Sequence, residues 1–190
     1  MKKVFIIGFN RTATKALHNL FKNSGYSSAH YSLADPTGGS IIIADQMVEN
    51  LRSYKPLMHR MDHIQVFSDM FWHREDTWID GNRYYHELHC DYPNAYFIMN
   101  TRDMDGWLNS KRNHKNGAYL KRCMEYHNLT EPDMLDWFRE NRDRVESEMR
   151  TYFKNNDRFI EFDVNNDPIS KLVNFLKPNF FLKESAWVRV

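Results

Sequence analysis

The chain has 190 residues, of which 42% are hydrophobic, so it is long enough to bury a core and falls within the usual size of one domain. Its 26 basic and 25 acidic residues leave a net charge of +1, which excludes a protein that binds nucleic acid through an overall positive field. Two cysteines are too few for a disulfide framework, and the apolar runs are too short for a membrane span or a signal peptide. We therefore expect a single soluble, cytoplasmic domain over residues 1–190.

The predicted elements alternate between strands and helices. In chain order, strands are expected at 4–7, 29–33, 63–67, 95–100 and 158–162, and helices at 14–23, 41–51, 81–90, 105–111, 131–153 and 169–176. The strands VFII and AYFIMN are continuous apolar runs, which are typical of parallel strands buried on both faces. The pattern predicts an α/β fold with a central, mainly parallel sheet flanked by helices. Ligands in such folds bind beyond the carboxyl ends of the strands, here after Ile7 and after Asn100.

The first strand is followed by a loop suited to holding a phosphate or sulfate group. GFNRTATKAL leaves the strand at Gly8, runs through a short polar loop and continues as a helix. Backbone N–H groups and the helix dipole bind anions at such a helix start. A Walker A motif would have Gly, Lys and a hydroxyl residue where this chain has Ala13, Thr14 and Lys15. The magnesium hydroxyl is thus missing, and the only cation inside the loop is Arg11.

This loop resembles the 5′-phosphosulfate loop of sulfotransferases that use 3′-phosphoadenosine-5′-phosphosulfate (PAPS). In that family a Lys or Arg precedes a Ser or Thr, a Gly and a pair of hydroxyl residues. The matching residues are Arg11, Thr12, Ala13, Thr14 and Lys15, so Ala13 replaces the glycine and Lys15 replaces the second hydroxyl. The resemblance implies that these residues bind the 5′-phosphosulfate and that Arg11 is the catalytic cation.

A second polar segment, TRDMDGWLNS, follows the strand AYFIMN. Arg102 lies at the end of this strand and Ser110 eight positions later on the predicted helix, so both side chains can converge on one phosphate. The segment also resembles the second donor motif of sulfotransferases, which implies that Arg102 and Ser110 bind the 3′-phosphate of the nucleotide. The alternative interpretation is that Arg102 pairs with Asp103 or Asp105 at a helix start, while Trp107 is a core residue.

Sulfuryl transfer needs a general base that takes the proton of the acceptor. The segment HIQVFSDMFWH offers three candidates, His63, Asp69 and His73. Asp69 is the first choice, because it follows the carboxyl end of a predicted strand and matches an Asp in the single-domain branch that the chain resembles. Histidine has the more suitable intrinsic pKa for a base. An Asp after a strand can also be a helix cap.

The sequence thus predicts a three-layer, P-loop-like sulfotransferase that moves a sulfuryl group from PAPS to an acceptor hydroxyl without a metal. The resemblance covers residues 4–107 and, more weakly, RFIEFDV and NFLKPNF. HELHC could suggest a metal site, but its histidines are three apart and no second cluster has suitable spacing. Two rivals stay open, a nucleotide kinase using ATP and magnesium and a degenerate nucleotide-binding module. The acceptor and the oligomeric state are not predicted, and specificity is expected from residues 32–40 and 113–130.

Overall fold

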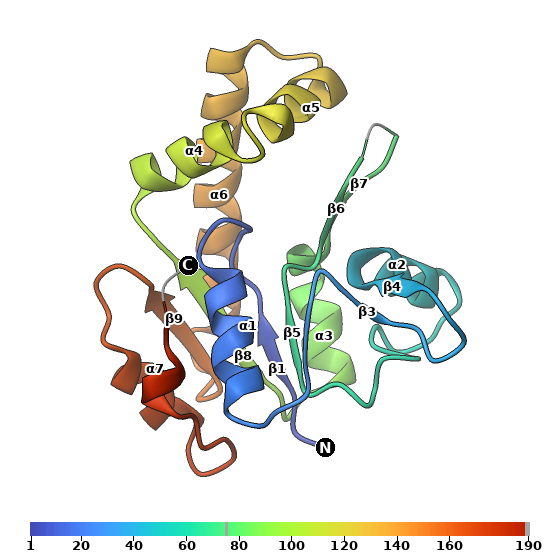
Figure 1. Ribbon diagram of the computed structural model, residues 1–190, viewed down its shortest axis with the longest axis vertical. Helices are drawn as coiled ribbons and strands as arrows, with labels where there is room; N and C mark the ends of the chain where they lie inside the picture. Colours follow the sequence, from blue (N-terminus) through green and yellow to red (C-terminus); the bar gives the residue numbers. More distant parts are fainter. Residues whose placement is uncertain (75, 189–190) are drawn as a thin grey trace.

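A computed structural model of the chain describes residues 1–74 and 76–188. Within these residues the central feature is a seven-stranded sheet with the order β4-β3-β2-β5-β1-β8-β9 (Figure 1). Its strands are β1 (Val4–Ile6), β2 (Ser28–His30), β3 (Ser32–Ala34), β4 (Ser40–Ile42), β5 (Val66–Ser68), β8 (Tyr96–Thr101) and β9 (Phe159–Asp163). The five strands β2, β5, β1, β8 and β9 run parallel, and β3 and β4 extend the sheet in antiparallel pairing. The prediction of a mainly parallel sheet is therefore confirmed.

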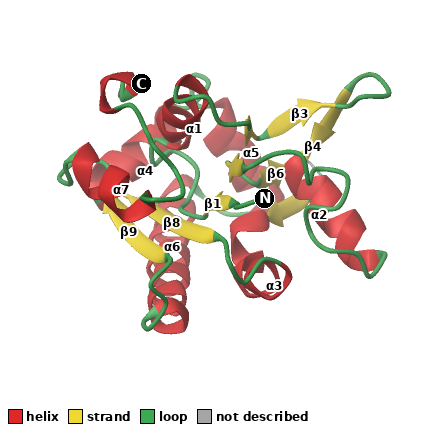
Figure 2. Cartoon of the chain, turned by 90° about the horizontal axis from the view of Figure 1, so that it is seen from below, coloured by secondary structure: helices red, strands yellow, loops and turns green. Residues whose placement is uncertain are grey.

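Helices cover both faces of this sheet. They are α1 (Thr14–Asn23), α2 (Ile43–Arg52), α3 (Tyr85–Asp91), α4 (Met104–Asn113), α5 (Ala118–His127), α6 (Glu131–Phe153) and α7 (Ile169–Leu176), with short 3-10 helices at Gly81–Tyr84 and Glu184–Ala186. Seen from below, α1 and α7 lie on one side of the central strands and α3 and α6 on the other (Figure 2). This arrangement confirms the three-layer α/β fold.

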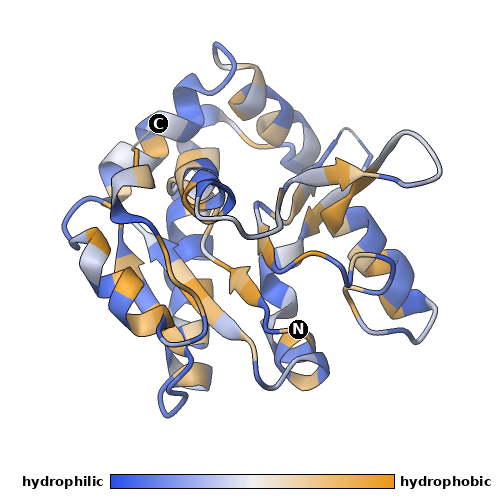
Figure 3. Ribbon diagram, turned by 60° about the horizontal axis from the view of Figure 1, so that its bottom comes forward, coloured by the Kyte–Doolittle hydropathy of each residue, from blue (hydrophilic) through white to orange (hydrophobic). Residues whose placement is uncertain are grey.

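The side chains of β1 enter two different hydrophobic clusters. Val4 and Ile6 pack in the cluster that contains Leu17 of α1, whereas Phe5 and Ile7 pack in the cluster that contains α3 and α6 residues. A strand buried on both faces needs apolar residues at every position, which explains its continuous apolar run. Figure 3 shows hydrophobic residues gathered on the central strands, with hydrophilic residues on the outer surfaces of the helices.

The parallel register brings three strand ends to one edge of the sheet. Residues Val4 to Ile6 of β1 pair with Tyr96 to Ile98 of β8, and Val4 and Phe5 also pair with Val66 and Phe67 of β5. The segments that follow β1, β8 and β5 therefore start side by side. These segments carry the loop after Ile7, Arg102 and Asp69.

The structure differs from the predicted elements in several places. The strand expected at 63–67 is the shorter β5, Val66–Ser68, because residues 62 and 63 form a turn. The helix expected at 81–90 starts as the 3-10 helix Gly81–Tyr84 and continues as α3. The strand expected at 29–33 is divided into β2 and β3, because Tyr31 between them adopts a left-handed conformation with φ of 64° and the chain reverses. The helix expected at 41–51 begins two residues later, since Ile41 and Ile42 belong to β4 and pair with β3. The hairpin of β6 (Phe71–His73) and β7 (Trp78–Asp80) and the helix α5 were not predicted. Their sequences are short or mixed and lack clear periodicity.

Helix α6 follows the sequence prediction closely. It spans Glu131–Phe153, and the side chain of Thr130 caps its first turn. Its apolar stripe buries Phe138, Val145 and Met149. Among the described residues, no helix is both long enough and apolar enough to cross a membrane.

Candidate functional site

The loop between β1 and α1 is fixed by one side chain from β8. The N–H of Gly8 donates to Oδ1 of Asn100 over 3.0 Å, and Nδ2 of Asn100 donates to the carbonyl and the hydroxyl oxygen of Thr12 over 2.7 and 2.6 Å. A Cβ on Gly8 would overlap the carbonyl oxygen and Oδ1 of Asn100, so only glycine fits this close approach. Asn100 thereby ties both ends of the loop to the neighbouring strand.

The hydroxyl group of Thr12 is used inside the loop. It donates to the carbonyl oxygen of Phe9 and accepts from Asn100, and the whole residue is buried. The sequence placed Thr12 among the donor-binding residues. Its side chain instead shapes the loop, so any contact of Thr12 with an anion is left to its backbone N–H.

Two residues of the loop adopt left-handed backbone conformations. Arg11 has a φ of 71°, and Ala13, which is the N-cap residue of α1, has a φ of 61°. Glycine adopts this region without strain, whereas a residue with a Cβ does so at a cost of about 1–2 kcal/mol. The conformation explains why the donor loop that this chain resembles has a glycine at the position of Ala13. The alanine keeps the same turn at that cost.

A second set of contacts, from α4, holds the middle of the loop. The indole N–H of Trp107 donates to the carbonyl oxygen of Asn10 over 2.9 Å, and Nζ of Lys111 donates to Oδ1 of Asn10 over 2.6 Å. Lys111 is buried, and its ammonium lies over the rings of Trp107, Tyr119 and Phe138. Burial lowers the pKa of Lys111 to about 8. A positive charge therefore lies beneath the loop, at a residue that the sequence did not single out.

Arg11 and Ser110 bring the two predicted motifs together. Nε of Arg11 donates to Oγ of Ser110 over 3.0 Å, although the residues are 99 positions apart in the sequence. Arg11, Arg102 and Ser110 line one open pocket, which we call the donor pocket, together with Gly106, Asn109, Asn113, His114 and Lys115. Arg11 of the first motif and Arg102 and Ser110 of the second thus face the same space.

Arg102 is held by its backbone, while part of its side chain lacks a partner. Its carbonyl oxygen accepts a hydrogen bond of 2.6 Å from the buried Arg142 of α6. Nε of Arg102 is buried and has no hydrogen-bond partner among the described residues, and it lies 3.7 Å from Oδ1 of Asp103. Asp103 itself caps α4 through Gly106 and accepts from Asn165. The contact with Asp103 therefore leaves hydrogen-bonding capacity on Arg102 for an anion.

Asp69 follows β5 and lines a second pocket. We call it the acceptor pocket, and its lining residues are Asn10, Lys15, His30, Tyr31, Asp69, Phe71, His73, Arg74, His114, Lys115, Tyr119 and Arg122. It adjoins the donor pocket, because His114 and Lys115 line both. Asp69 has a left-handed backbone with φ of 54°, and one of its carboxylate oxygens is buried without a hydrogen-bond partner among the described residues. Burial raises the pKa of Asp69 to about 6, against the nearby charges of Lys111, His73 and Arg11.

His30 is the closest polar neighbour of Asp69. Its Nε2 lies 3.5 Å from Oδ2 of Asp69, and its Nδ1 lies 3.0 Å from Oγ of Ser68. Burial and the charge of Lys15 lower the pKa of His30 to about 4, so this ring is neutral at pH 7. The sequence did not single out His30. Its position at the carboxyl end of a short strand was the only available signal.

His73 and His63, the other two candidates for the general base, lie in different surroundings from Asp69. His73 is buried, with Nδ1 3.0 Å from the hydroxyl of Tyr119, Nε2 2.8 Å from Asp80 and its ring stacked on Trp78. Both of its nitrogens are occupied, and burial is the main cause that lowers its pKa. His63 is exposed and precedes β5, at the end opposite to Asp69. Of the three candidates, Asp69 is the one that lies at the carboxyl end of β5 with a buried side-chain oxygen that lacks a hydrogen-bond partner among the described residues.

The last two residues of the first motif point to different surroundings. Thr14 is the first residue of α1 and is buried. Lys15 is exposed and lines the acceptor pocket, where its charge acts on His30. The lysine that stands in place of a hydroxyl thus contributes a cation on the side of Asp69.

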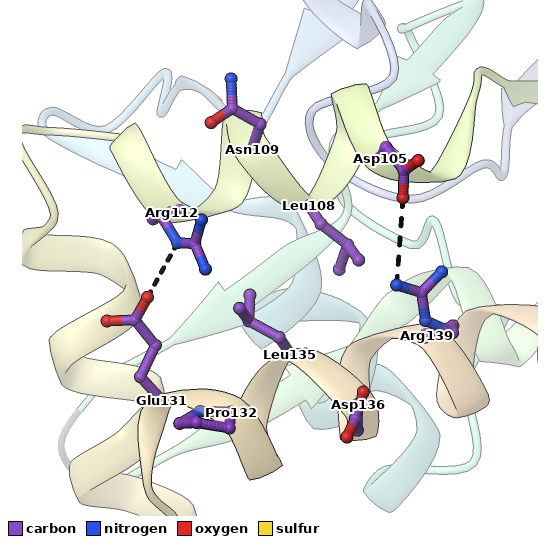
Figure 4. A pocket seen from close by; sticks show the side chains of 9 residues that line it. All are labelled: Asp105, Leu108, Asn109, Arg112, Glu131, Pro132, Leu135, Asp136 and Arg139. Atoms are coloured by element: carbon purple, nitrogen blue, oxygen red, sulfur yellow. Dashed lines mark ion pairs between the residues drawn. The ribbon is translucent and has the colours of Figure 1, made fainter.

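Another hollow lies between α4 and α6, away from the strand ends (Figure 4). Leu108 and Leu135 face each other across it. Arg112 pairs with Glu131 over 2.8 Å on one side and Arg139 lies 4.0 Å from Asp105 on the other. Both arginines of this hollow are therefore paired with a carboxylate.

The HELHC segment does not gather metal ligands in the described part of the chain. His86 stacks on Tyr152, and His89 contacts the hydroxyl of Tyr152 and the amide of Asn156. No group of three or more His, Cys, Asp or Glu side chains among the described residues could hold a metal ion.

Comparison with protein families gives a match over most of the chain. A family model described as a sulfotransferase domain matches residues 3–158. The matched range includes the loop after β1, Asp69, Arg102 and Ser110, and it ends just before β9. No curated protein matches the chain.

Proposed function

This chain belongs to the sulfotransferase domain family and is a transferase, and we propose that it moves a sulfuryl group from PAPS to the hydroxyl group of an acceptor. The observation that carries the proposal is the convergence of Arg11, Arg102 and Ser110 on one pocket, from two motifs far apart in the sequence. The buried Nε of Arg102, which has no partner among the described residues, fits a site that receives an anion.

The residues divide between the two ends of the donor. Arg102 and Ser110 would hold the 3′-phosphate, the first by a charge-assisted contact and the second by its hydroxyl. The backbone N–H groups from Arg11 to Lys15, at the start of α1, would hold the 5′-phosphosulfate together with the Arg11 guanidinium. Lys111 lies under the same loop and adds a positive charge without touching the donor.

In the proposed reaction the acceptor oxygen attacks the sulfur atom of PAPS in line. A new S–O bond forms, the bond between sulfur and the 5′-phosphate oxygen breaks, and the electron pair leaves with 3′,5′-bisphosphoadenosine. Arg11 would stabilise the negative charge that develops on the bridging and sulfuryl oxygens. Asp69 would take the acceptor's proton, and its raised pKa of about 6 leaves it ionised at pH 7 while making it a better base than an exposed carboxylate.

We also propose that residues 1–190 form a single domain of this kind. Strand β9 lies outside the matched residues, yet it pairs with β8 along five positions. Phe180 packs on Phe21 of α1, and Asn179 donates to the hydroxyl of Tyr96 over 2.7 Å. The segment after residue 158 therefore completes the same sheet and core.

Titration calorimetry with Arg102→Ala tests the proposal. Loss of a charge-assisted contact worth about 1.5–3 kcal/mol should weaken binding of 3′,5′-bisphosphoadenosine roughly 10- to 150-fold and leave adenosine 5′-monophosphate nearly unchanged. Arg112→Ala is the matched control, because Arg112 lies on α4, the helix that follows Arg102, and pairs with Glu131 instead of lining the donor pocket. Equal losses for both nucleotides would contradict the assigned contact, and preference of the wild type for ATP with magnesium would contradict the proposed donor.

A further inference from the structure

The acceptor pocket carries positive charge, and two of its cations, Arg74 and Arg122, lie outside the donor motifs and the donor pocket. Four basic side chains line it, Lys15, Arg74, Lys115 and Arg122, against one carboxylate, Asp69, among the described residues. The chain as a whole is nearly neutral, with a net charge of +1. The imbalance is therefore local to this pocket.

The four pocket cations differ from the arginines of helix α6 in their ion pairing. On α6, Arg142, Arg144 and Arg150 each form an ion pair within the helix or with β9. None of the four pocket cations forms an ion pair with a carboxylate that the structure describes. Their charge is thus left for a ligand.

Two of the cations are oriented by neutral groups. Nη1 of Arg122 donates to the carbonyl oxygen of His73 over 3.1 Å. The guanidinium of Arg74 lies 4.3 Å from the ring centre of Trp72, and its Nη2 donates to the hydroxyl of Tyr31 over 3.4 Å. Contacts of this kind restrain a guanidinium without cancelling its charge. Arg74 follows β6 and Arg122 is on α5, so neither belongs to the two donor motifs.

The same positive charge helps to lower the pKa of two histidines that line the pocket, His30 and His114. The pKa of His114 is lowered first by burial and then by the charges of Arg11, Lys115, Lys111 and Arg122. Lys15 acts in the same direction on His30. Both effects favour a negatively charged ligand over a neutral or cationic one.

Resting on the proposed sulfuryl transfer, we infer that the acceptor is itself an anion, a hydroxyl compound carrying a carboxylate or sulfate ester that Arg74 and Arg122 bind while its hydroxyl meets Asp69. A neutral alcohol or phenol would leave these guanidiniums without an anionic partner. The pairing would also restrict which hydroxyl of a polyol reaches Asp69, because the anionic group is held by two residues outside the donor motifs.

The test measures binding to protein already saturated with 3′,5′-bisphosphoadenosine, so that added anions meet an occupied donor pocket. Glucuronate, glucose 6-sulfate and glucose are titrated in turn, which separates a carboxylate from a sulfate ester and both from the neutral sugar. We expect at least one of the two anions to bind 10-fold or more tightly than glucose. Arg122→Gln and Arg74→Gln should each reduce that preference about 10-fold.

Lys121→Gln is the matched control, since Lys121 precedes Arg122 on α5, is exposed and pairs with Glu125 rather than lining the pocket. It should leave the preference unchanged, and thermal unfolding should confirm that all three variants fold. Equal binding of glucose and both anions, or equal losses in Lys121→Gln, would overturn the inference. Failure of the bisphosphate itself to bind would contradict the proposed function, and the inference with it.

Discussion

The two adjoining pockets are built in different ways. The donor pocket rests on a backbone loop held by buried side chains, since Asn100 anchors Gly8 and Thr12 while Trp107 and Lys111 anchor Asn10. The acceptor pocket is lined by side chains from the β6–β7 hairpin, α5 and the ends of β2 and β5. The donor pocket is thus shaped by the core, and under the proposed function the acceptor would be selected by side chains nearer the surface, such as the exposed Arg74 and the half-buried Arg122.

Among the substitutions that would distinguish the roles of the two pockets, Asp69→Asn should have the largest effect, and this effect should be on turnover. Loss of a general base lowers turnover by about 10²- to 10⁴-fold, while affinity for 3′,5′-bisphosphoadenosine should stay within about 2-fold. In the wild type, kcat/KM should rise with pH through about 6, because Asp69 must be deprotonated to act. Steady-state kinetics from pH 5 to 8 and calorimetry measure both, with the exposed Asp157→Asn as control. Unchanged turnover would remove Asp69 from the proposed mechanism.

Asn100→Ala should affect the donor side and the stability of the fold together. It leaves the N–H of Gly8 and the carbonyl oxygen of Thr12 without their partner, at about 1–3 kcal/mol for each buried group. We expect a loss of at least about 2 kcal/mol in the free energy of unfolding, measured by urea denaturation, and weaker nucleotide binding. Asn155→Ala, at an exposed residue just after α6 that lines neither pocket, is the control. If stability fell without any loss of nucleotide affinity, the loop would not depend on its anchor.

Lys111 gives the donor side a pH dependence of its own. Its pKa of about 8 in the folded protein is below its usual value of about 10.4, so between these values the unfolded chain binds more protons than the native one. The contribution of Lys111 to stability should therefore rise with pH in this window, by at most about 1.4 kcal/mol per pH unit. In Lys111→Met this contribution should vanish, and the difference between the two urea-denaturation profiles at pH 8 to 10 isolates it. Parallel profiles would mean that Lys111 titrates normally.

The smallest expected effect concerns the left-handed turn at Ala13. Ala13→Gly relieves a strained φ of 61° and increases the freedom of the unfolded chain, so we expect a net gain below about 1 kcal/mol in the free energy of unfolding. Nucleotide affinity should be unchanged, because the turn is already formed. Ala118→Gly, in the first turn of the helix α5, should instead destabilise the protein. A large rise in affinity for Ala13→Gly would show that the alanine distorts the loop.

Much of the sheet and the positions of both donor motifs could be predicted from the sequence. The strands β1 and β8 are buried on both faces and therefore read as continuous apolar runs. Carboxyl ends of neighbouring parallel strands meet at one edge, so the approach of Arg11 to Ser110 follows from topology. The contacts of Thr12 could not be predicted, because its hydroxyl accepts a hydrogen bond from Asn100, which is 88 positions away in the sequence.

The β6–β7 hairpin of the acceptor pocket and the buried Lys111 beneath the donor loop were harder to predict, for a physical reason. The strands β6 and β7 have three residues each, too few to show a period, and Lys111 sits in a basic run that resembles a solvated helix end. Its burial depends on the rings of Trp107, Tyr119 and Phe138, which only the folded chain brings together. Local patterns predict elements, whereas these surroundings arise from contacts between them.

The hydrogen bonds of Asn100 with Gly8 and Thr12 make the shape of the donor loop depend on the folding of the sheet. They join residues 92 and 88 positions apart, so neither motif has its shape until β1 and β8 are side by side. A fragment ending before β8 would carry the first motif without the side chain that closes the loop. Nucleotide should then bind the native chain and not its unfolded forms, which makes a saturating nucleotide a stabiliser of the entire sheet, by about 2.7 kcal/mol at a hundred times its dissociation constant.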